Sequence, residues 1–130
     1  MADVLIDTSA WIQASNRRGD PWFRDKVAYL LKNNRAVITE PIAFEILARV
    51  KPHERKFWET RLQGVKQINV RSGDWYVAAY HAYKLRRKGI TVKNFDILIA
   101  TIVMENNLAL LHRDRDFDHI SEYLPLQIFK

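Results

Sequence analysis

The sequence contains no cysteine, which excludes both disulfide cross-links and thiolate metal ligands. Without disulfides, the cytoplasm is the compartment that we expect. No stretch approaches the ~20 consecutive apolar residues that a membrane-spanning helix needs. The N-terminal segment MADVLIDTSAWI lacks the basic start of a signal peptide, and its apolar run is too short. We therefore expect neither a membrane segment nor a secretory leader.

Glycine and proline are few, four of each in 130 residues, and the chain has neither an internal repeat nor a linker. Hydrophobic residues make up 48% of the sequence, enough for the core of a single domain over residues 1–130. The net charge of +6, from 21 Lys and Arg against 15 Asp and Glu, favours an anionic partner such as nucleic acid. The basic residues are spread along the chain, so charge alone does not identify a function.

Short apolar runs alternate with amphipathic segments along the chain, which is the pattern of strands and helices. Strands are expected at 4–6, 36–39, 66–70, 108–111 and 126–129. Helices are expected after an N-cap at Thr8 or Ser9, from Asp20-Pro21, over 41–50 and 51–63, over 73–89 with Gly89 as terminator, and over 94–107. This order predicts an α/β fold, a three-layer α/β/α sandwich with a mostly parallel sheet of about five strands.

Five acidic residues fall where such a sheet places its functional site, beyond the carboxyl ends of the strands. Asp7 ends the first strand, and Asp114 and Asp116 follow the strand that ends at Leu111. Asp96 lies in the first turn of the most apolar helix, and Glu45 points near the core-facing side of its helix. Carboxylates that converge in this way repel one another unless a hard divalent cation, Mg²⁺ or Mn²⁺, neutralises them. The sequence is compatible with one ion or two.

The same residues carry a resemblance to a known family. The segments VLIDTSAWI, AFEILA, NFDILIAT and LLHRDRDF resemble the four acidic motifs of the PIN-domain nucleases, and most of all the VapC-type toxin ribonucleases of toxin–antitoxin pairs. The resemblance covers essentially the whole chain. It implies metal ligation by Asp7, Glu45, Asp96 and Asp114, with Asp116 as a fifth carboxylate, and leaves open whether Asp114 or Asp116 binds directly. It also implies a homodimer and a protein antitoxin that plugs the active site.

Hydrolysis of an RNA phosphodiester gives the remaining residues roles. A metal ion offsets the repulsion between carboxylates and phosphate, and a carboxylate not committed to metal, Asp116 or Glu45, is expected to orient or deprotonate the attacking water. Contacts with RNA are expected from cations beside the acidic motifs, from hydroxyls next to the first aspartate and from one aromatic ring that stacks on a base: Lys93, Arg113, Arg115, Thr8, Ser9 and Trp11.

These residues also have other interpretations. Asp7 and Asp96 also suit helix N-termini as caps. His112 and His119 suggest zinc, but no second pair of nitrogen or sulfur ligands accompanies them. A receiver domain needs a lysine after a late strand, and this chain has none in the right place. A haloacid-dehalogenase-type phosphatase needs D-x-D on the first strand, where this chain has DTSA. A housekeeping RNA-processing PIN nuclease and a non-catalytic RNA-binding module of the same fold remain as alternatives.

Overall fold

Four short parallel strands form the centre of the molecule in this computed structural model, which describes all residues from Met1 to Lys130. They are β1 (Val4–Ile6), β2 (Ala36–Ile38), β3 (Lys66–Gln67) and β4 (Ala109–Leu111), in the sheet order β3-β2-β1-β4. The segment expected as a fifth strand makes a single parallel bridge, between Leu110 and Ile128. The prediction of an α/β fold with a parallel sheet is confirmed.

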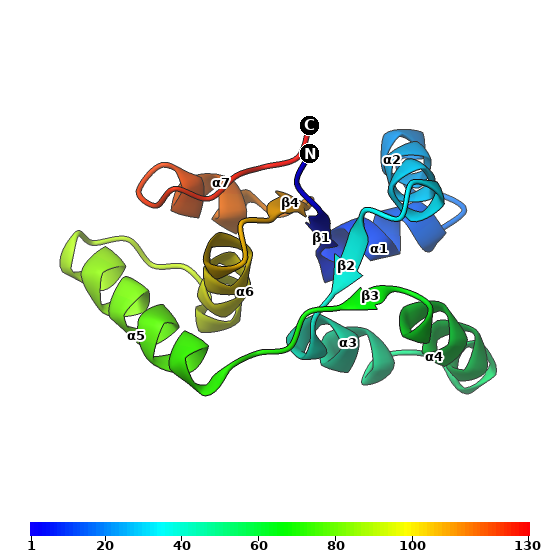
Figure 1. Cartoon of the computed structure of the whole chain (residues 1–130), viewed down its shortest axis with the longest axis horizontal. Helices are drawn as coiled ribbons and strands as arrows, with labels where there is room; N and C mark the ends of the chain where they lie inside the picture. Colours follow the sequence, from blue (N-terminus) through cyan, green and yellow to red (C-terminus); the bar gives the residue numbers. More distant parts are fainter.

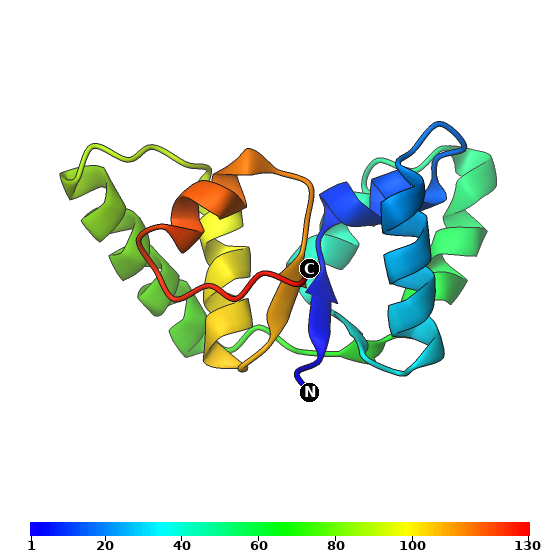
Figure 2. The same ribbon diagram turned by 90° about the horizontal axis from the view of Figure 1, so that it is seen from above.

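Seven helices surround the sheet. They are α1 (Thr8–Ser15), α2 (Pro21–Lys32), α3 (Glu40–Leu47), α4 (Arg55–Gln63), α5 (Ser72–Arg87), α6 (Asn94–Glu105) and α7 (Arg115–Ser121), with a 3-10 turn η1 (Pro52–Glu54) before α4. Figures 1 and 2 show α5, α6 and α7 on one side of β1 and α1 to α4 on the other. Helix α7 was not among the expected helices.

The core explains why the strands are apolar throughout. Every residue of β1, β2 and β4 is buried, as expected for parallel strands covered on both faces. Helix α6 is buried from Asp96 to Val103 because α5, α7 and β4 all pack against it. Each fully buried Leu or Ile side chain stabilises the fold by about 1.5–3 kcal/mol relative to an exposed one.

The ends of the helices agree only in part with the caps predicted from the sequence. The Asp20 carboxylate accepts the Trp22 N–H and caps α2 with Pro21 next to it, and Gly89 follows α5 with a left-handed φ of 79°. The expected N-cap of α1 was wrong: Asp7 is the cap, and its carboxylate accepts the Ser9 N–H. Strand β1 ends at Ile6, so the helix begins at once and the capping position falls on the aspartate.

No helix has both the length and the apolar composition needed to cross a bilayer. The cytoplasmic location stays a prediction.

The sheet order places the first and last strands side by side. Strand β1 pairs with β2 on one flank and with β4 on the other, and the Asp7 N–H donates to the Leu111 carbonyl at 2.9 Å. The chain therefore leaves β1 toward one side and returns on the other. In open α/β sheets ligands bind at such a reversal of strand order, beyond the carboxyl ends.

Candidate metal centre

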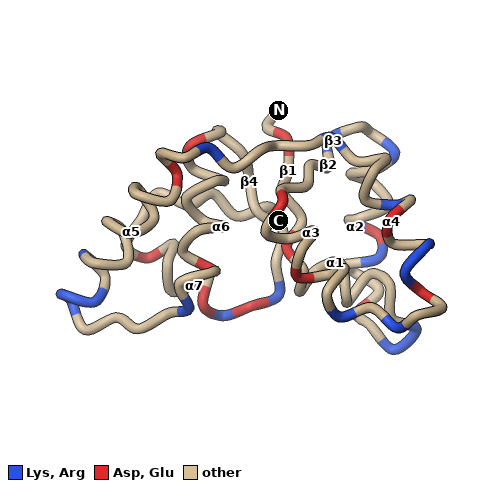
Figure 3. The backbone as a smooth tube through the Cα atoms, turned by 90° about the horizontal axis from the view of Figure 1, so that it is seen from below, with Lys and Arg blue, Asp and Glu red and all other residues tan.

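Four aspartates arrive at this reversal point from different parts of the chain. Asp7 follows β1, Asp114 and Asp116 stand at the start of α7 just beyond β4, and Asp96 is the third residue of α6. Figure 3 shows acidic positions gathered around the segment that leads into α7, with basic positions alternating among them. The fold thus joins residues that are up to 109 positions apart in the sequence.

Three of the aspartates form a compact group. One carboxylate oxygen from each of Asp96, Asp114 and Asp116 lies within 4.8 Å of the other two. The only cation within ion-pair distance is the Lys93 ammonium, 3.9 Å from Asp114 Oδ2 and largely exposed. One exposed ammonium does not balance three carboxylates in so small a volume.

Asp96 is the least solvated member of the group. Its side chain is 8% exposed, and its Oδ2 is buried without any hydrogen-bond partner. Burial, followed by repulsion from Asp114 and Asp7, raises the pKa of Asp96 from 3.8 to about 7, although Lys93 acts in the opposite direction. An unpartnered buried carboxylate oxygen among other carboxylates has the chemistry of an oxygen ligand for a hard divalent cation. The donor set therefore fits Mg²⁺ or Mn²⁺.

Asp7 is also buried, which raises its pKa, as does the charge of Asp114. Ser9 counteracts part of this increase because its N–H and its Oγ–H donate to Asp7 Oδ2 at 3.0 and 2.6 Å. The same Ser9 hydroxyl accepts the Arg113 N–H at 2.9 Å. Ser9 was expected to contact RNA; instead, its hydroxyl links the end of β1 to the segment after β4 and is used within the protein.

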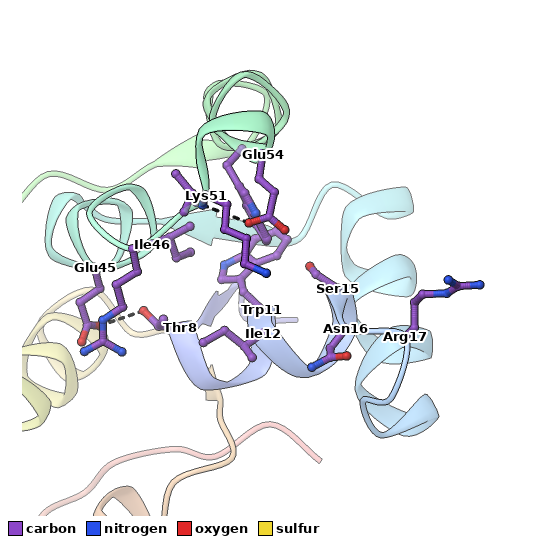
Figure 4. Close-up of a pocket in the computed structure, with 13 residues that line it drawn as sticks. Thr8, Trp11, Ile12, Ser15, Asn16, Arg17, Glu45, Ile46, Lys51 and Glu54 are labelled. Carbon is purple, nitrogen blue, oxygen red and sulfur yellow. Dashed lines mark hydrogen bonds between the residues drawn. The ribbon is translucent and has the colours of Figure 1, made fainter.

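Glu45 stands apart from the three-aspartate group. Its Oε1 accepts the Thr8 hydroxyl at 2.8 Å, a contact visible as a dashed line in Figure 4. Thr8 is buried, and the fold turns its hydroxyl toward Glu45; its contact with RNA stays a prediction. Glu45 therefore lies beside the first motif rather than within the group, and its role as a metal ligand stays a prediction.

The segment after β4 holds its shape through its own side chains. The Asp114 N–H donates to His112 Nδ1 at 3.0 Å, and His112 Nε2 lies 3.4 Å from Asp118 Oδ1. Asp114 Oδ1 accepts the Asp116 N–H at 2.9 Å, which makes Asp114 the N-cap of α7. A cap followed by buried Phe117 and Ile120 at helical spacing was the signal that sequence reasoning missed.

The histidines do not form a zinc site. His112 is committed to the contacts just described, His119 is exposed, and no histidine belongs to a group of potential metal ligands.

Two of the residues predicted to contact RNA carry exposed positive charges near the three-aspartate group. Arg113 and Arg115 are both exposed, and the Arg113 guanidinium donates to Gln13 Oε1 at 2.7 Å. Trp11, expected to stack on a base, is 2% exposed, and its ring meets Trp58 edge to face with centroids 5.9 Å apart. Its contact with RNA stays a prediction. Residue 11 follows the first turn of α1 and lies on the face of this helix that packs against the core, so its aromatic ring is part of the core.

Sequence comparison identifies relatives of the whole chain. Residues 4–123 match the PIN domain family. The chain is 35% identical over 129 residues to the VapC ribonuclease Mb1587 of Mycobacterium bovis and to the ribonuclease VapC11 of Mycobacterium tuberculosis, covering 95% of this chain and 96% of each relative.

Solved structures share the fold at lower sequence identity. The DNA-bound VapBC of Salmonella typhimurium matches with a TM-score of 0.79 and 18% identity, over 99% of this chain and 98% of that chain. VapBC-1 of nontypeable Haemophilus influenzae matches with a TM-score of 0.77 and 20% identity, over 98% and 96%. At these identities the likeness establishes the arrangement of helices and strands.

Proposed function

The chain belongs to the PIN domain family, and on that premise we propose that Asp7, Asp96, Asp114 and Asp116 are the centre of its activity. The protein is a metal-dependent endoribonuclease of the VapC type. The observation that supports these residues is the group of three carboxylates within 4.8 Å, one with a buried oxygen that has no partner. A non-catalytic RNA-binding module has no need to keep such mutual repulsion.

We assign Asp96 and Asp114 to holding Mg²⁺ or Mn²⁺. Asp7 and Glu45 are assigned as further ligands, on the side of the group that faces β1. When bound, the ion withdraws charge from the phosphate and lowers the pKa of water. Asp114 is preferred over Asp116 as a direct ligand because its backbone N–H, its Oδ1 and Lys93 already fix its position.

Asp116 is the carboxylate that we assign to the attacking water. Its side chain makes no ion pair and accepts no hydrogen bond, although it belongs to the three-carboxylate group. A carboxylate with free lone pairs beside the reacting phosphate orients water and accepts its proton. Lys93, Arg113 and Arg115 hold the flanking phosphates, since they supply exposed positive charge around the group.

The function is tested by incubating an end-labelled single-stranded RNA with the protein in Mg²⁺, in Mn²⁺ and in EDTA. We expect internal cleavage that requires metal and stops in EDTA. Cleavage that continues in EDTA, or RNA binding without any cleavage in either metal, would overturn the assignment.

The exposed arginines predict the effect of salt on RNA affinity. Because Arg115 contacts a phosphate in this account, Arg115→Glu should weaken RNA binding severalfold and lower the slope of log affinity against log salt by about 0.7. Binding is measured by fluorescence anisotropy between 50 and 300 mM salt. The matched control is Lys32→Glu, which changes the charge equally in the last turn of α2, just before β2 and so near the amino ends of the strands. Equal slopes in the two variants would contradict the contact.

The partners follow from the relatives. Solved structures that share the fold include a toxin–antitoxin complex from Klebsiella pneumoniae and VapBC-5 of Mycobacterium tuberculosis, a member of the VapBC family of toxin–antitoxin systems. We propose that this chain likewise binds a protein antitoxin, that RNA is its substrate, and that it forms a homodimer.

The dimer is expected to use an aromatic face of α5. Trp75, Tyr76, Tyr80 and Tyr83 are 57%, 80%, 58% and 57% exposed, more aromatic surface than a small monomer usually leaves in water. Sedimentation at micromolar concentration should give a dimer, and Trp75→Glu with Tyr76→Glu should give a monomer. Tyr29→Glu, an exposed aromatic change on α2, is the control. A wild-type monomer would contradict this prediction.

A further inference from the structure

A cavity lies beside the metal centre, on the side of Thr8 and Glu45. It has a volume of about 470 Å³ and lies between α1, the end of α3, the turn η1 and α4. Thr8 and Glu45, joined by the hydrogen bond described above, form its boundary toward the metal centre. Figure 4 shows the cavity extending from this pair past Trp11 toward Ser15. It falls within the range of 300–1,000 Å³ that is typical of ligand pockets.

The walls of this pocket combine an apolar surface with unpaired cations. Five hydrophobic side chains line it: Trp11, Ile12, Ile46, Val50 and Trp58. Arg49 and Lys51 also line it and are exposed, and neither side chain takes part in any ion pair. In Figure 4 the Lys51 side chain reaches toward Trp11, whereas Arg17 points away.

The two acidic groups in the walls are already engaged. Glu45 accepts the Thr8 hydroxyl, and Glu54 Oε1 accepts the Lys51 backbone N–H at 3.2 Å. Hydrogen bonds do not remove the charge of these carboxylates, but the three cations of the lining, Arg17, Arg49 and Lys51, outnumber them by one. The ammonium of Lys51 and the guanidinium of Arg49 make no ion pair and are therefore the groups that attract an anion such as a phosphate.

A hydroxyl group without a partner also lies in the wall of this pocket. The Ser15 hydroxyl makes no hydrogen bond in the protein, and Ser15 also lines the pocket. A flat heteroaromatic ring with polar edges, packed on Ile46 and Val50, suits such a surface.

We propose that this pocket binds a nucleotide of the RNA strand next to the scissile phosphate, with the base on the apolar wall and a phosphate against Arg49 and Lys51. The proposal rests on the ribonuclease function given above. It makes the pocket a determinant of which base is tolerated beside the cleavage site. An RNA strand bound in this way passes from the pocket over Glu45 to the aspartates, with Arg113 and Arg115 on the far side.

Charge reversal in the pocket tests the phosphate contact. Arg49→Glu and Lys51→Glu are each compared with wild type and with Lys32→Glu for binding of a 2′-O-methyl single-stranded oligonucleotide pool, a probe that resists cleavage. Each pocket variant should lose about tenfold in affinity, equivalent to about 1.4 kcal/mol. The slope of log affinity against log salt should fall by about 0.7, while Lys32→Glu keeps the wild-type slope.

A neutral change tests the position of the base. Ser15→Tyr places a ring in the pocket without changing the charge, and sequencing of fragments from a random RNA pool reports the base preference around the cut. The variant should raise KM, keep kcat within about twofold and change the preference at one position next to the scissile bond.

The outcomes separate the two proposals. If wild type and Lys32→Glu bind the oligonucleotide with the same slope as Arg49→Glu and Lys51→Glu, the pocket does not hold RNA and is left to a protein partner. If the slope falls as expected in Arg49→Glu and Lys51→Glu but wild type cleaves nothing in metal, the proposed function fails while the contact between RNA and the pocket stands. An unchanged base preference in Ser15→Tyr, with unchanged KM, would also overturn the pocket.

Discussion

Replacing Asp96 with asparagine should reduce metal-dependent RNA cleavage by about a hundredfold or more. Changes in groups that merely orient metal ligands typically cost 10–100-fold, and Asp96 contributes a carboxylate oxygen to the group itself. Asparagine has nearly the same shape, so the variant removes one negative charge and one anionic oxygen with little change in packing. The assay is initial-rate cleavage of labelled RNA at saturating Mn²⁺.

The same change should not destabilise the metal-free protein. Burial and the negative charges of Asp114 and Asp7 both disfavour the ionised carboxylate of Asp96. In EDTA at pH 8, Asp96→Asn should therefore raise the free energy of unfolding by about 1–3 kcal/mol, because it removes a charge that opposes folding. Mg²⁺ or Mn²⁺ should increase the melting temperature of wild type much more than that of the variant.

The control for this pair of measurements is Asp25→Asn, an exposed aspartate on α2 outside the group. It should leave cleavage, stability and the response to metal close to wild type. If Asp96→Asn instead lowers the stability of the metal-free protein by several kcal/mol and still cleaves RNA, Asp96 is a structural residue of α6.

The contribution of Asp96 to the stability of the metal-free protein should fall as the pH rises from about 4 to about 7. The pKa of Asp96 is 3.8 unperturbed and about 7 in the folded chain, so between these values the folded state binds a proton that the unfolded state has lost. Unfolding then becomes easier with increasing pH, and the loss ends above the folded-state pKa. The difference of about 3 pKa units sets an upper limit of about 4 kcal/mol. The raised pKa of Asp7 acts in the same direction.

Urea unfolding of wild type and Asp96→Asn in EDTA, at half-unit steps from pH 4.5 to 8.5, measures this contribution. The difference in unfolding free energy between the two proteins should grow in favour of the variant up to about pH 7 and then stay constant. A difference that is independent of pH, or one that grows in favour of wild type, would show that Asp96 is not held in its neutral form by the fold.

The strands and most helices were predictable because their sequence signals are local. The apolar runs of β1, β2 and β4 and the stripe of α6 each require burial, and burial on both faces needs a covered parallel sheet. The α7 helix was not predicted because three aspartates and two arginines surround its two buried residues, Phe117 and Ile120, and obscure their helical spacing. In place of the predicted fifth strand there is a single bridge, in which Ile128 pairs with Leu110 of β4.

The acidic group was predictable as a set of residues, since strand ends and a helix first turn converge in this topology. Its internal arrangement was not. Glu45 is drawn to Thr8 by a hydrogen bond that joins side chains 37 residues apart, and Ser9 is bound to Asp7 and to the Arg113 backbone. Sequence spacing along a helix does not report such contacts across the fold, nor does it distinguish a buried ring such as that of Trp11 from a stacking one.

The central claim is that these aspartates hold a divalent cation, and anomalous diffraction from crystals soaked in Mn²⁺ tests it most directly. We expect an anomalous peak between the carboxylates of Asp7, Asp96 and Asp114. The peak should be lost or greatly weakened in Asp96→Asn crystals soaked in the same way. Crystals of active wild-type protein with no Mn²⁺ peak at this group, or with equal occupancy in Asp96→Asn, would contradict it.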